Sequence, residues 1–351
     1  GMARDTPLET APDQLPSPEP YTAPSSHPAS PAHPPLSRSS DRSRGWLLFD
    51  AIVDRASQTT TSPWVRDDGR LVYRPDFATL ELLLGVPLRL GAPTTSGVPA
   101  LALDVWLVYE LHRAGFASDV VWPRPSEPRI LPGPIAELVK SLPKRESEEL
   151  RRRLETSKSL RSAAPSEARI LGKNYEKQVD VLMSHWSTGP ELMISTKRMD
   201  SSFGKNAPNR IEEAYGDAKN LRLRHPLAAI GFFFGIRSTV FSQAPMTAEW
   251  IVDLMQKLSR EDDAYGATCL LPMEYSEYEG GADHDDAGDQ PVEAVLEHLP
   301  AVTVREDLVP ENVRTSVFLG RMIQQVLSAT PVTHHVTVRE RIKSASRKEK
   351  S

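Results

Sequence analysis

The amino-acid sequence predicts an α/β fold. A near-continuous apolar run from Leu227 to Ile236 is too short to cross a membrane and fits a central buried strand. A second apolar strand, "ELMIST" (191–196), follows the Gly189-Pro190 turn, and helical spacing of apolar residues fills the segment between the two strands. We therefore expect strands and helices to alternate around a buried sheet.

Composition limits the function classes. The 351 residues can bury a core for two modest domains, and a net charge of −5 argues against a uniformly basic nucleic-acid coat protein while leaving room for a local basic surface. A single cysteine, Cys269, excludes a disulfide framework or a cysteine-based zinc site within one chain and fits a reducing compartment. Without a secretion signal or an apolar run long enough for a membrane span, a cytoplasmic protein is expected. Gly1 before Met2 is typical of a tag-cleavage scar.

Three segments are expected along the chain. Residues 1–44 are rich in Pro and Ser and poor in large apolar residues, which predicts a disordered arm. Residues 45–135 predict a smaller N-terminal α/β region, with helices at 46–53 and 101–111 and a hairpin around Asp68-Gly69. Residues 136–345 form the remainder.

Two charged segments have alternative interpretations. The cation-rich stretch 144–161 is either a solvated helix with Glu-to-Arg pairs or a surface that follows a phosphate backbone. An acidic loop is expected over 274–292, where the spacing of Asp283 to Asp289 lacks the pattern of a calcium loop and favours solvation. Near the C-terminus, "THHVTVRERI" (333–342) predicts a strand, on which His334 and His335 would face opposite sides.

Two carboxylates precede the first apolar strand. Apolar residues recur at steps of four and three over 171–186, which predicts a helix with one apolar stripe. Glu176 and Asp180 would lie one turn apart beside that stripe, where they either point into a cleft as metal ligands or pair with Lys173 and Lys177.

Lys197 stands at the end of the strand 191–196. Alternation places Ser195 and Lys197 on one face of the strand, with Thr196 and Arg198 on the other. A lysine at this place either extends to solvent or lies in a cleft, where its ammonium can orient water or stabilise charge on a phosphate.

The next helix is acidic. Asn206 and Pro208 suit its cap and first turn, and an exposed helix N-terminus favours bound phosphate. Glu212 flanks its apolar stripe on one side, whereas Glu213 and Asp217 lie on the opposite flank, and either flank could face Lys197.

The order helix, strand with terminal lysine, acidic helix and buried strand, over 170–237, resembles the core of the PD-(D/E)xK nuclease superfamily, especially type II restriction endonucleases. The resemblance implies a mixed central β-sheet flanked by helices. In that superfamily an Asp and a (D/E)xK pair on neighbouring strands bind magnesium, and an upstream helix often adds a Glu. Here the tripeptide is Ser195-Thr196-Lys197, similar to a branch with (S/T)xK in which the following helix supplies the carboxylate.

The resemblance implies specific site residues. Glu212 and Glu213, 15 and 16 residues beyond Lys197, are the candidates for the helix carboxylate. The PD dipeptide is missing, and Glu191 lies about 20 Å from Lys197 along a straight strand, too far to share a metal. The second acid is therefore expected from Glu176, Asp180 or Asp217, or from a strand not recognised in the sequence.

The function expected from the resemblance is Mg²⁺-dependent hydrolysis of DNA by a restriction-type endonuclease, in which Lys197 and Ser195 assist the carboxylates. Such an enzyme would act as a homodimer, beside a cognate methyltransferase, with residues 45–135 as a specificity module and residues 136–345 as the nuclease-like catalytic domain. A DNA-binding protein that keeps the fold without the chemistry, or a structural ion-pair cluster unrelated to nucleic acid, are the alternatives. The cations expected to contact the DNA backbone are Arg198, Lys205, Arg210, Lys219, Arg222 and Arg224.

Overall fold

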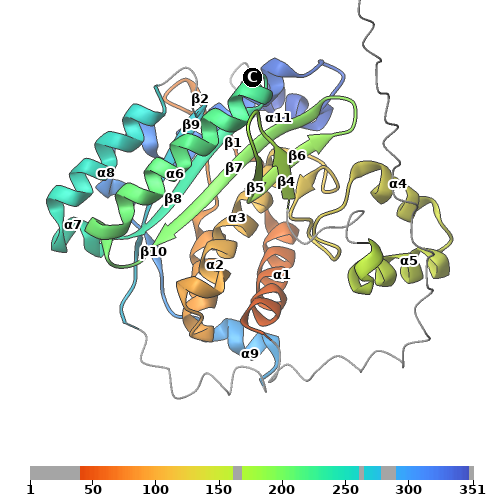
Figure 1. Ribbon diagram of the computed structural model, residues 1–351, viewed down its shortest axis with the longest axis horizontal. Coiled ribbons are helices and arrows are strands. Elements are labelled where there is room, and N and C mark those ends of the chain that lie inside the picture. Colours follow the sequence, from red (N-terminus) through yellow and green to blue (C-terminus); the bar gives the residue numbers. More distant parts are fainter. Residues whose placement is uncertain (1–39, 161–167, 261–264, 278–289, 348–351) are drawn as a thin grey trace, which may run out of the picture. The chain divides into compact units, whose positions relative to one another are not determined.

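A six-stranded mixed sheet organises the chain in the computed structural model, which describes residues 40–160, 168–260, 265–277 and 290–347 (Figure 1). The strand order is β10-β9-β8-β7-β6-β3; β7, β8 and β9 are parallel, and the other neighbours are antiparallel. The strands of this sheet are β3 (Val121–Trp122), β6 (Val181–His185), β7 (Gly189–Met199), β8 (Ala229–Arg237), β9 (Ala267–Glu274) and β10 (Thr303–Val304).

Helices cover both faces of the sheet. One face packs against α1 (Asp41–Thr59), α2 (Phe77–Leu90), α3 (Val98–Ala114) and α10 (Thr315–Ala329). The opposite face packs against α6 (Phe203–Arg224) and α8 (Pro245–Leu258). This arrangement confirms the predicted α/β class at the level of a mixed sheet flanked by helices. Among the described residues, no helix has the length and apolarity to span a membrane.

The remaining elements lie around this sheet. They are β1 (Trp64–Asp67), β2 (Arg70–Tyr73), α4 (Gly133–Ser141), α5 (Lys144–Thr156), β4 (Ala168–Leu171), β5 (Glu176–Val179), α7 (Thr239–Gln243), α9 (Val292–Glu297) and α11 (Val336–Arg347). Two pairs form separate hairpins, β1 with β2 around the predicted Asp68-Gly69 turn and β4 with β5.

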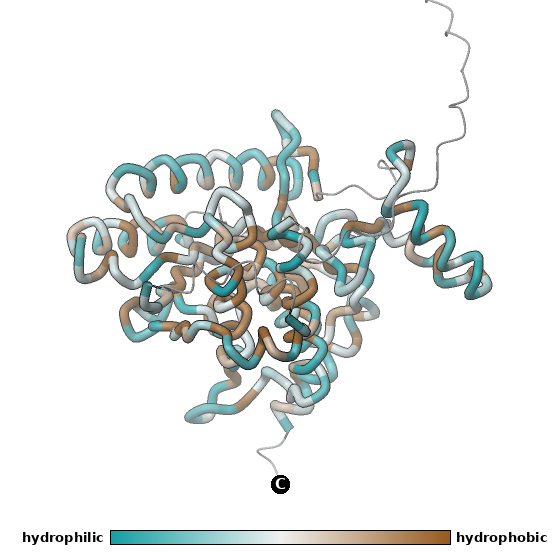
Figure 2. Tube along the Cα trace, turned by 90° about the horizontal axis from the view of Figure 1, so that it is seen from below, coloured by the Kyte–Doolittle hydropathy of each residue, from teal (hydrophilic) through white to brown (hydrophobic). Residues whose placement is uncertain are grey.

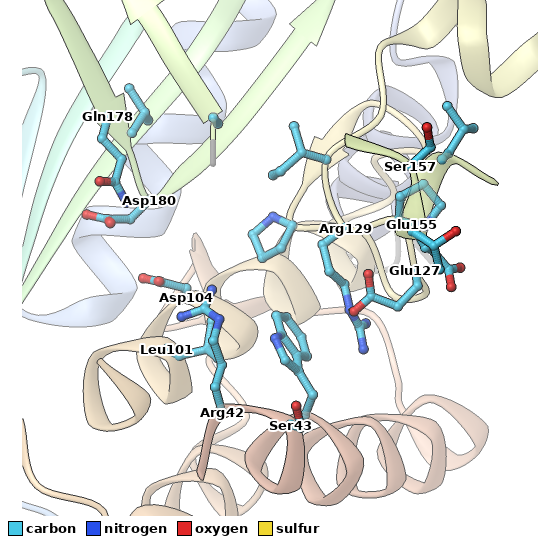
Figure 3. Close-up of a pocket in the computed structure, with 18 residues that line it drawn as sticks. Arg42, Ser43, Leu101, Asp104, Glu127, Arg129, Glu155, Ser157, Gln178 and Asp180 are labelled. Atoms are coloured by element: carbon cyan, nitrogen blue, oxygen red, sulfur yellow. The ribbon is translucent and has the colours of Figure 1, made fainter. Parts of the chain in front are cut away.

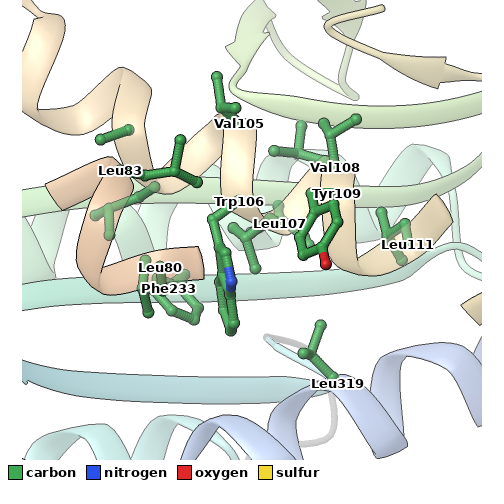
Figure 4. Close-up of a cluster of buried hydrophobic side chains, with 14 of the residues drawn as sticks. Leu80, Leu83, Val105, Trp106, Leu107, Val108, Tyr109, Leu111, Phe233 and Leu319 are labelled. Atoms are coloured by element: carbon green, nitrogen blue, oxygen red, sulfur yellow. The ribbon is translucent and has the colours of Figure 1, made fainter. Parts of the chain in front are cut away.

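The largest core cluster joins the N-terminal helices to the sheet. Trp106, Leu107 and Leu111 of α3 are fully buried together with Phe233 of β8 and Leu319 of α10, as Figure 4 shows. Hydrophobic stretches accordingly occupy the interior of the folded chain in Figure 2. Because residues 45–116 share one core with the sheet, α3 can bring a side chain directly to β7.

The predicted helix over 171–186 is wrong. This segment forms β4, β5 and β6, and three residues of the supposed stripe, Leu171, Tyr175 and Trp186, are exposed at turns and strand ends. The buried side chains are instead Val179 and the consecutive residues Val181 to Met183. A short apolar run bounded by turn residues fits a strand as well as a helix, and here the sheet determines its conformation.

The predicted strand near the C-terminus is also wrong, because α11 occupies Val336–Arg347. Val338, Ile342 and Ala345 recur at helical spacing and face the core, which outweighs the β-branched residues at the start of this segment. The expected start of α6 at Asn206 lies one turn late, since the helix begins at Phe203. The Pro/Ser-rich arm, except residues 40–44, and the centre of the acidic loop (278–289) lie outside the described residues.

A buried hydrogen-bonded pair joins the residue before the C-terminal helix to the sheet. Glu191, at the start of β7, accepts hydrogen bonds from His335 Nε2 at 2.6 Å and from Thr188 Oγ1 at 2.7 Å. Burial raises the pKa of Glu191, but the hydrogen bonds from His335 and Thr188 outweigh burial and leave the pKa lowered. Glu191 therefore serves the fold at the end of β7 remote from Lys197.

Glu191→Ala is expected to lower the free energy of unfolding by about 2 kcal/mol at pH 7, because it leaves the buried hydrogen-bond donors without an acceptor. Since the folded pKa is lowered, the stabilisation is present above the ordinary pKa of about 4.3 and is lost as the pH falls through the folded value. Urea unfolding at several pH values measures this difference. The exposed Glu249→Ala on α8 is the matched control, and an equal loss in both variants, or a pH-independent difference, would contradict the assignment.

Candidate active site

The candidate site lies where β6 and β7 part. Their antiparallel pairing ends at Val181 and Ile194, while β7 continues to pair with β8 as far as Met199. The backbone N–H of Thr196 has no partner on β6, and it donates instead to Asp180 Oδ2 at 2.8 Å. Asp180, directly before β6, is thus fixed beside the Ser195-Thr196-Lys197 tripeptide.

A second carboxylate reaches the same residue from α3. The hydroxyl of Thr196 donates to Asp104 Oδ1 at 2.5 Å, and Asp104 is 8% exposed. One threonine therefore binds two carboxylates from different elements, through its backbone and through its side chain. Asp104 was not predicted from the sequence, although a charged residue inside the apolar run "LALDVWLV" (101–108) was an available signal.

The negative charges of Asp104 and Asp180 are only partly compensated by nearby hydrogen bonds and cations. Burial raises the pKa of Asp104 well above its ordinary value, and the charge of Asp180 raises it further, against the opposing effects of Thr196 and Arg42. Burial also raises the pKa of Asp180, although its hydrogen bond from Thr196 and the nearby charges of Lys197 and Lys177 oppose this. Their ionised forms would be stabilised by an added cation.

Lys197 lies on the other face of β7, as the strand alternation predicts. Its Nζ is 3.6 Å from Glu213 Oε1 on α6. Lys177 of β5 approaches the same oxygen at 3.8 Å and Asp217 Oδ2 at 2.7 Å. The flank of α6 that faces Lys197 is therefore the one with Glu213 and Asp217, and Glu213 is the helix carboxylate in contact with the lysine.

The β4–β5 hairpin is fastened to α6. The hydroxyl of Tyr175 donates to Asp217 Oδ1 at 2.8 Å, and the side chain of Asn220 binds the backbone of Asn174 and Tyr175. Burial and the hydrogen bond to Asp217 raise the pKa of Tyr175 to about 12. These contacts hold Lys177 beside Glu213.

Among the described residues, the other predicted acids, Glu176 and Glu212, form no ion pair with Lys197. Glu176 is exposed on β5, where its carboxylate lies 3.5 Å from Arg169. Glu212 is exposed on α6, and Ser195 is buried on the same face of β7 as Lys197. Four residues predicted from the sequence therefore lie close together in the structure: Lys197, Glu213, Asp180 and Asp217. The two predicted acids Glu176 and Glu212 lie apart from them.

The predicted DNA-binding cations divide into two groups. Arg198 is buried and binds Asp200, and Arg222 donates to the carbonyls of Pro226 and Ala228, so both are engaged in the fold. Lys205 and Arg224 are exposed on α6, Arg210 is partly exposed, and Lys219 lies over the ring of Tyr215.

A cavity of about 700 Å³ opens beside Asp104 and Asp180. Figure 3 shows both carboxylates at one side of it, with Arg42 of α1 beside Asp104, and with Glu127 and Arg129 of the loop between β3 and α4 across the cavity. The sequence did not predict this cavity, because its walls come from six separate segments.

Asp104 and Asp180 are the candidate ligands for the Mg²⁺ expected from the resemblance. Within the described ranges, no three His, Cys, Asp or Glu side chains form a group able to hold a metal ion. Mg²⁺, however, usually takes only one or two carboxylates and completes its shell with water and substrate phosphate. Two neighbouring carboxylates with raised pKa values at the edge of a cavity fit this mode of binding.

In comparisons with known proteins, no family model matches the chain, and no curated protein or solved structure matches it at the significance threshold. The chemistry of the site is therefore inferred from its own residues.

Asp104→Asn is expected to raise the melting temperature in EDTA at pH 8 by roughly 2 °C, about 1 kcal/mol. The amide oxygen still accepts from Thr196, while the charge beside Asp180 is removed. Because the folded pKa of Asp104 is raised, the wild type loses stability as the pH rises above the ordinary value of about 3.9, so the gain shrinks toward pH 4. Thermal unfolding checks this.

Asp253→Asn on α8, whose carboxylate belongs to an exposed ion pair, serves as the control. Mg²⁺ should stabilise the wild type and not Asp104→Asn. An Asp104→Asn protein that is less stable at pH 8 than the wild type would mean that the carboxylate charge is compensated within the fold.

Proposed function

We propose that this protein is a Mg²⁺-dependent endodeoxyribonuclease of the PD-(D/E)xK type that hydrolyses DNA phosphodiester bonds. The proposal is carried by one observation: Asp180, directly before β6, and the Ser195-Thr196-Lys197 tripeptide of β7 lie where these two antiparallel strands part, and the Thr196 amide joins them. An aspartate and a lysine-bearing strand end on neighbouring strands are the elements that the sequence resemblance requires.

Each remaining part of the motif has a candidate. Ser195 stands where the superfamily has its acidic residue, and Glu213, in contact with Lys197, is the replacement carboxylate from the following helix. Asp104 corresponds to the acid that an upstream helix often adds, and its bond from Thr196 joins it to Asp180. The missing PD aspartate is thus Asp180 in this proposal.

The residues then have separate roles in hydrolysis, in which water adds to phosphorus and one P–O bond breaks. Asp104 and Asp180 would hold Mg²⁺, which when bound supplies charge that polarises the phosphodiester and acidifies water. Lys197 orients the attacking water or stabilises negative charge on the phosphate. Glu213 forms an ion pair with the ammonium of Lys197 and helps to keep it in place.

DNA backbone contacts are assigned to cations that the fold leaves accessible. Lys205 and Arg210 lie on the first half of α6, and Arg42 lines the cavity close enough to Asp104 to affect its pKa. A restriction-type enzyme of this kind would act as a homodimer and have a cognate methyltransferase as its protective partner.

Lys197→Ala is expected to lower the rate of Mg²⁺-dependent cleavage of unmethylated phage DNA at least about 100-fold, because it removes the positioned ammonium. Glu213→Ala should also lower the rate, since Lys197 loses its ion-pair partner. Glu212→Ala, at the neighbouring exposed position, is the matched control and should leave the rate unchanged. Gel analysis of the fragments with Mg²⁺ or EDTA measures all four proteins.

Two outcomes would contradict the proposal. Cleavage that survives Lys197→Ala in a folded protein would move the chemistry elsewhere. No cleavage by the wild type, together with DNA binding that weakens as salt rises, would identify a DNA-binding protein that retains the fold without catalysis.

A further inference from the structure

The cavity beside Asp104 and Asp180 has a second wall that the proposed hydrolysis does not use. Trp46 of α1 lines it, and the guanidinium carbon of Arg129 lies 3.7 Å from the centroid of the Trp46 ring. Arg129 is fixed in turn by two hydrogen bonds to Asp50, at 2.7 and 3.1 Å. The cavity thus contains a guanidinium that is held over an aromatic ring in one position.

Such a pair has a specific ligand preference. Unstacked nucleobases stack on aromatic rings and on arginine guanidinium planes, and every base offers a flat face for this contact. Ser43 of α1, Gln178 of β5 and Ser157 after α5 also line the cavity and offer hydrogen-bonding groups of the kind that bind base edges (Figure 3).

The net negative charge of the residues that line the cavity favours an uncharged nucleobase over phosphate groups as the ligand. Among the lining residues, four are acidic and two, Arg42 and Arg129, are cationic. The acidic residues are Asp104, Glu127, Glu155 and Asp180. An uncharged ring can enter such a cavity, whereas a chain of phosphates would be repelled from it except beside Arg42 or a bound cation.

The size of the cavity sets a further limit. A sphere of about 700 Å³ is roughly 11 Å across, no wider than the major groove alone of B-DNA at about 12 Å. A whole duplex cannot enter, but one nucleotide can. The two carboxylates at the edge of the cavity place the metal-dependent chemistry of the proposed function next to the nucleotide that enters.

We propose that this cavity binds one unstacked nucleobase of the substrate strand, on the Trp46–Arg129 pair, next to the phosphate that is cleaved. The identity of that phosphate rests on the proposed nuclease function, whereas the base pocket rests on the cavity itself. The base comes either from a single strand or from a nucleotide rotated out of a duplex.

Binding of three fluorescent 20-mers, with Ca²⁺ in place of Mg²⁺, tests the pocket by fluorescence anisotropy. The probes are a single strand, its perfect duplex, and the same duplex with a central mismatched bubble. Trp46→Ala should weaken binding of the single strand or the bubble about tenfold and leave binding of the perfect duplex unchanged. An effect on the single strand alone identifies single-stranded substrate, and an effect on the bubble as well identifies rotated-out bases.

Trp250→Ala on α8, which is partly exposed and not a lining residue, is the control and should change none of the three affinities. Trp46→Phe keeps an aromatic face and should retain binding. If the alanine variant does not fold, Trp46→Leu repeats the test with apolar volume restored.

A change at Trp46 that alters the affinity for all three DNAs equally, or for none of them, would contradict the proposed base pocket. If the protein still cleaves DNA in that case, the proposed nuclease function stands and only the base pocket is wrong. A selective effect of the Trp46 change in a protein that does not cleave DNA would support the base pocket and contradict the nuclease function.

Discussion

The site depends on the two hydrogen bonds of Thr196. Because β6 leaves β7 after Ile194, the Thr196 amide is free to bind Asp180, and strand alternation turns its hydroxyl toward Asp104 on α3. Two buried carboxylates are thereby held near one another, an arrangement that a protein tolerates only with compensating hydrogen bonds or a cation. The parting of the strands and the packing of α3 on the sheet are both needed for this pairing, and neither element alone creates it.

The next residue extends the site to the opposite face of the sheet. Lys197 points to α6, where Glu213 lies near both Lys197 and Lys177 of β5. Asp217, Tyr175 and Asn220 hold the β4–β5 hairpin in position. The Asp104–Asp180 pair is therefore held by Thr196, and Lys197 is the next residue of β7. The helix α3 that carries Asp104 and the helix α6 that faces Lys197 belong to different hydrophobic clusters. The α3 face opens into the cavity with Trp46 and Arg129, and the α6 face carries the accessible cations Lys205 and Arg210.

Local patterns predicted the parts of the site that lie on long, regular elements. The lysine at the end of β7, the acidic helix after it and the buried β8 follow from alternation and helical spacing over uninterrupted segments. Asp180 was a candidate, but its segment was predicted as a helix because a five-residue strand has too few positions to define its period. Asp104 and Trp46 reach the site only through packing of α1 and α3 on the sheet, which no sequence spacing encodes.

The most direct test of this account is the location of a bound divalent cation. Crystals soaked with Mn²⁺, a substitute for Mg²⁺ with a measurable anomalous signal, should give an anomalous difference peak within coordination distance of the Asp104 and Asp180 carboxylates. Asp180→Asn crystals treated in the same way should lose that peak. A peak elsewhere in the chain, or no peak between these carboxylates at saturating Mn²⁺, would contradict the assignment of the metal site on which the proposed hydrolysis rests.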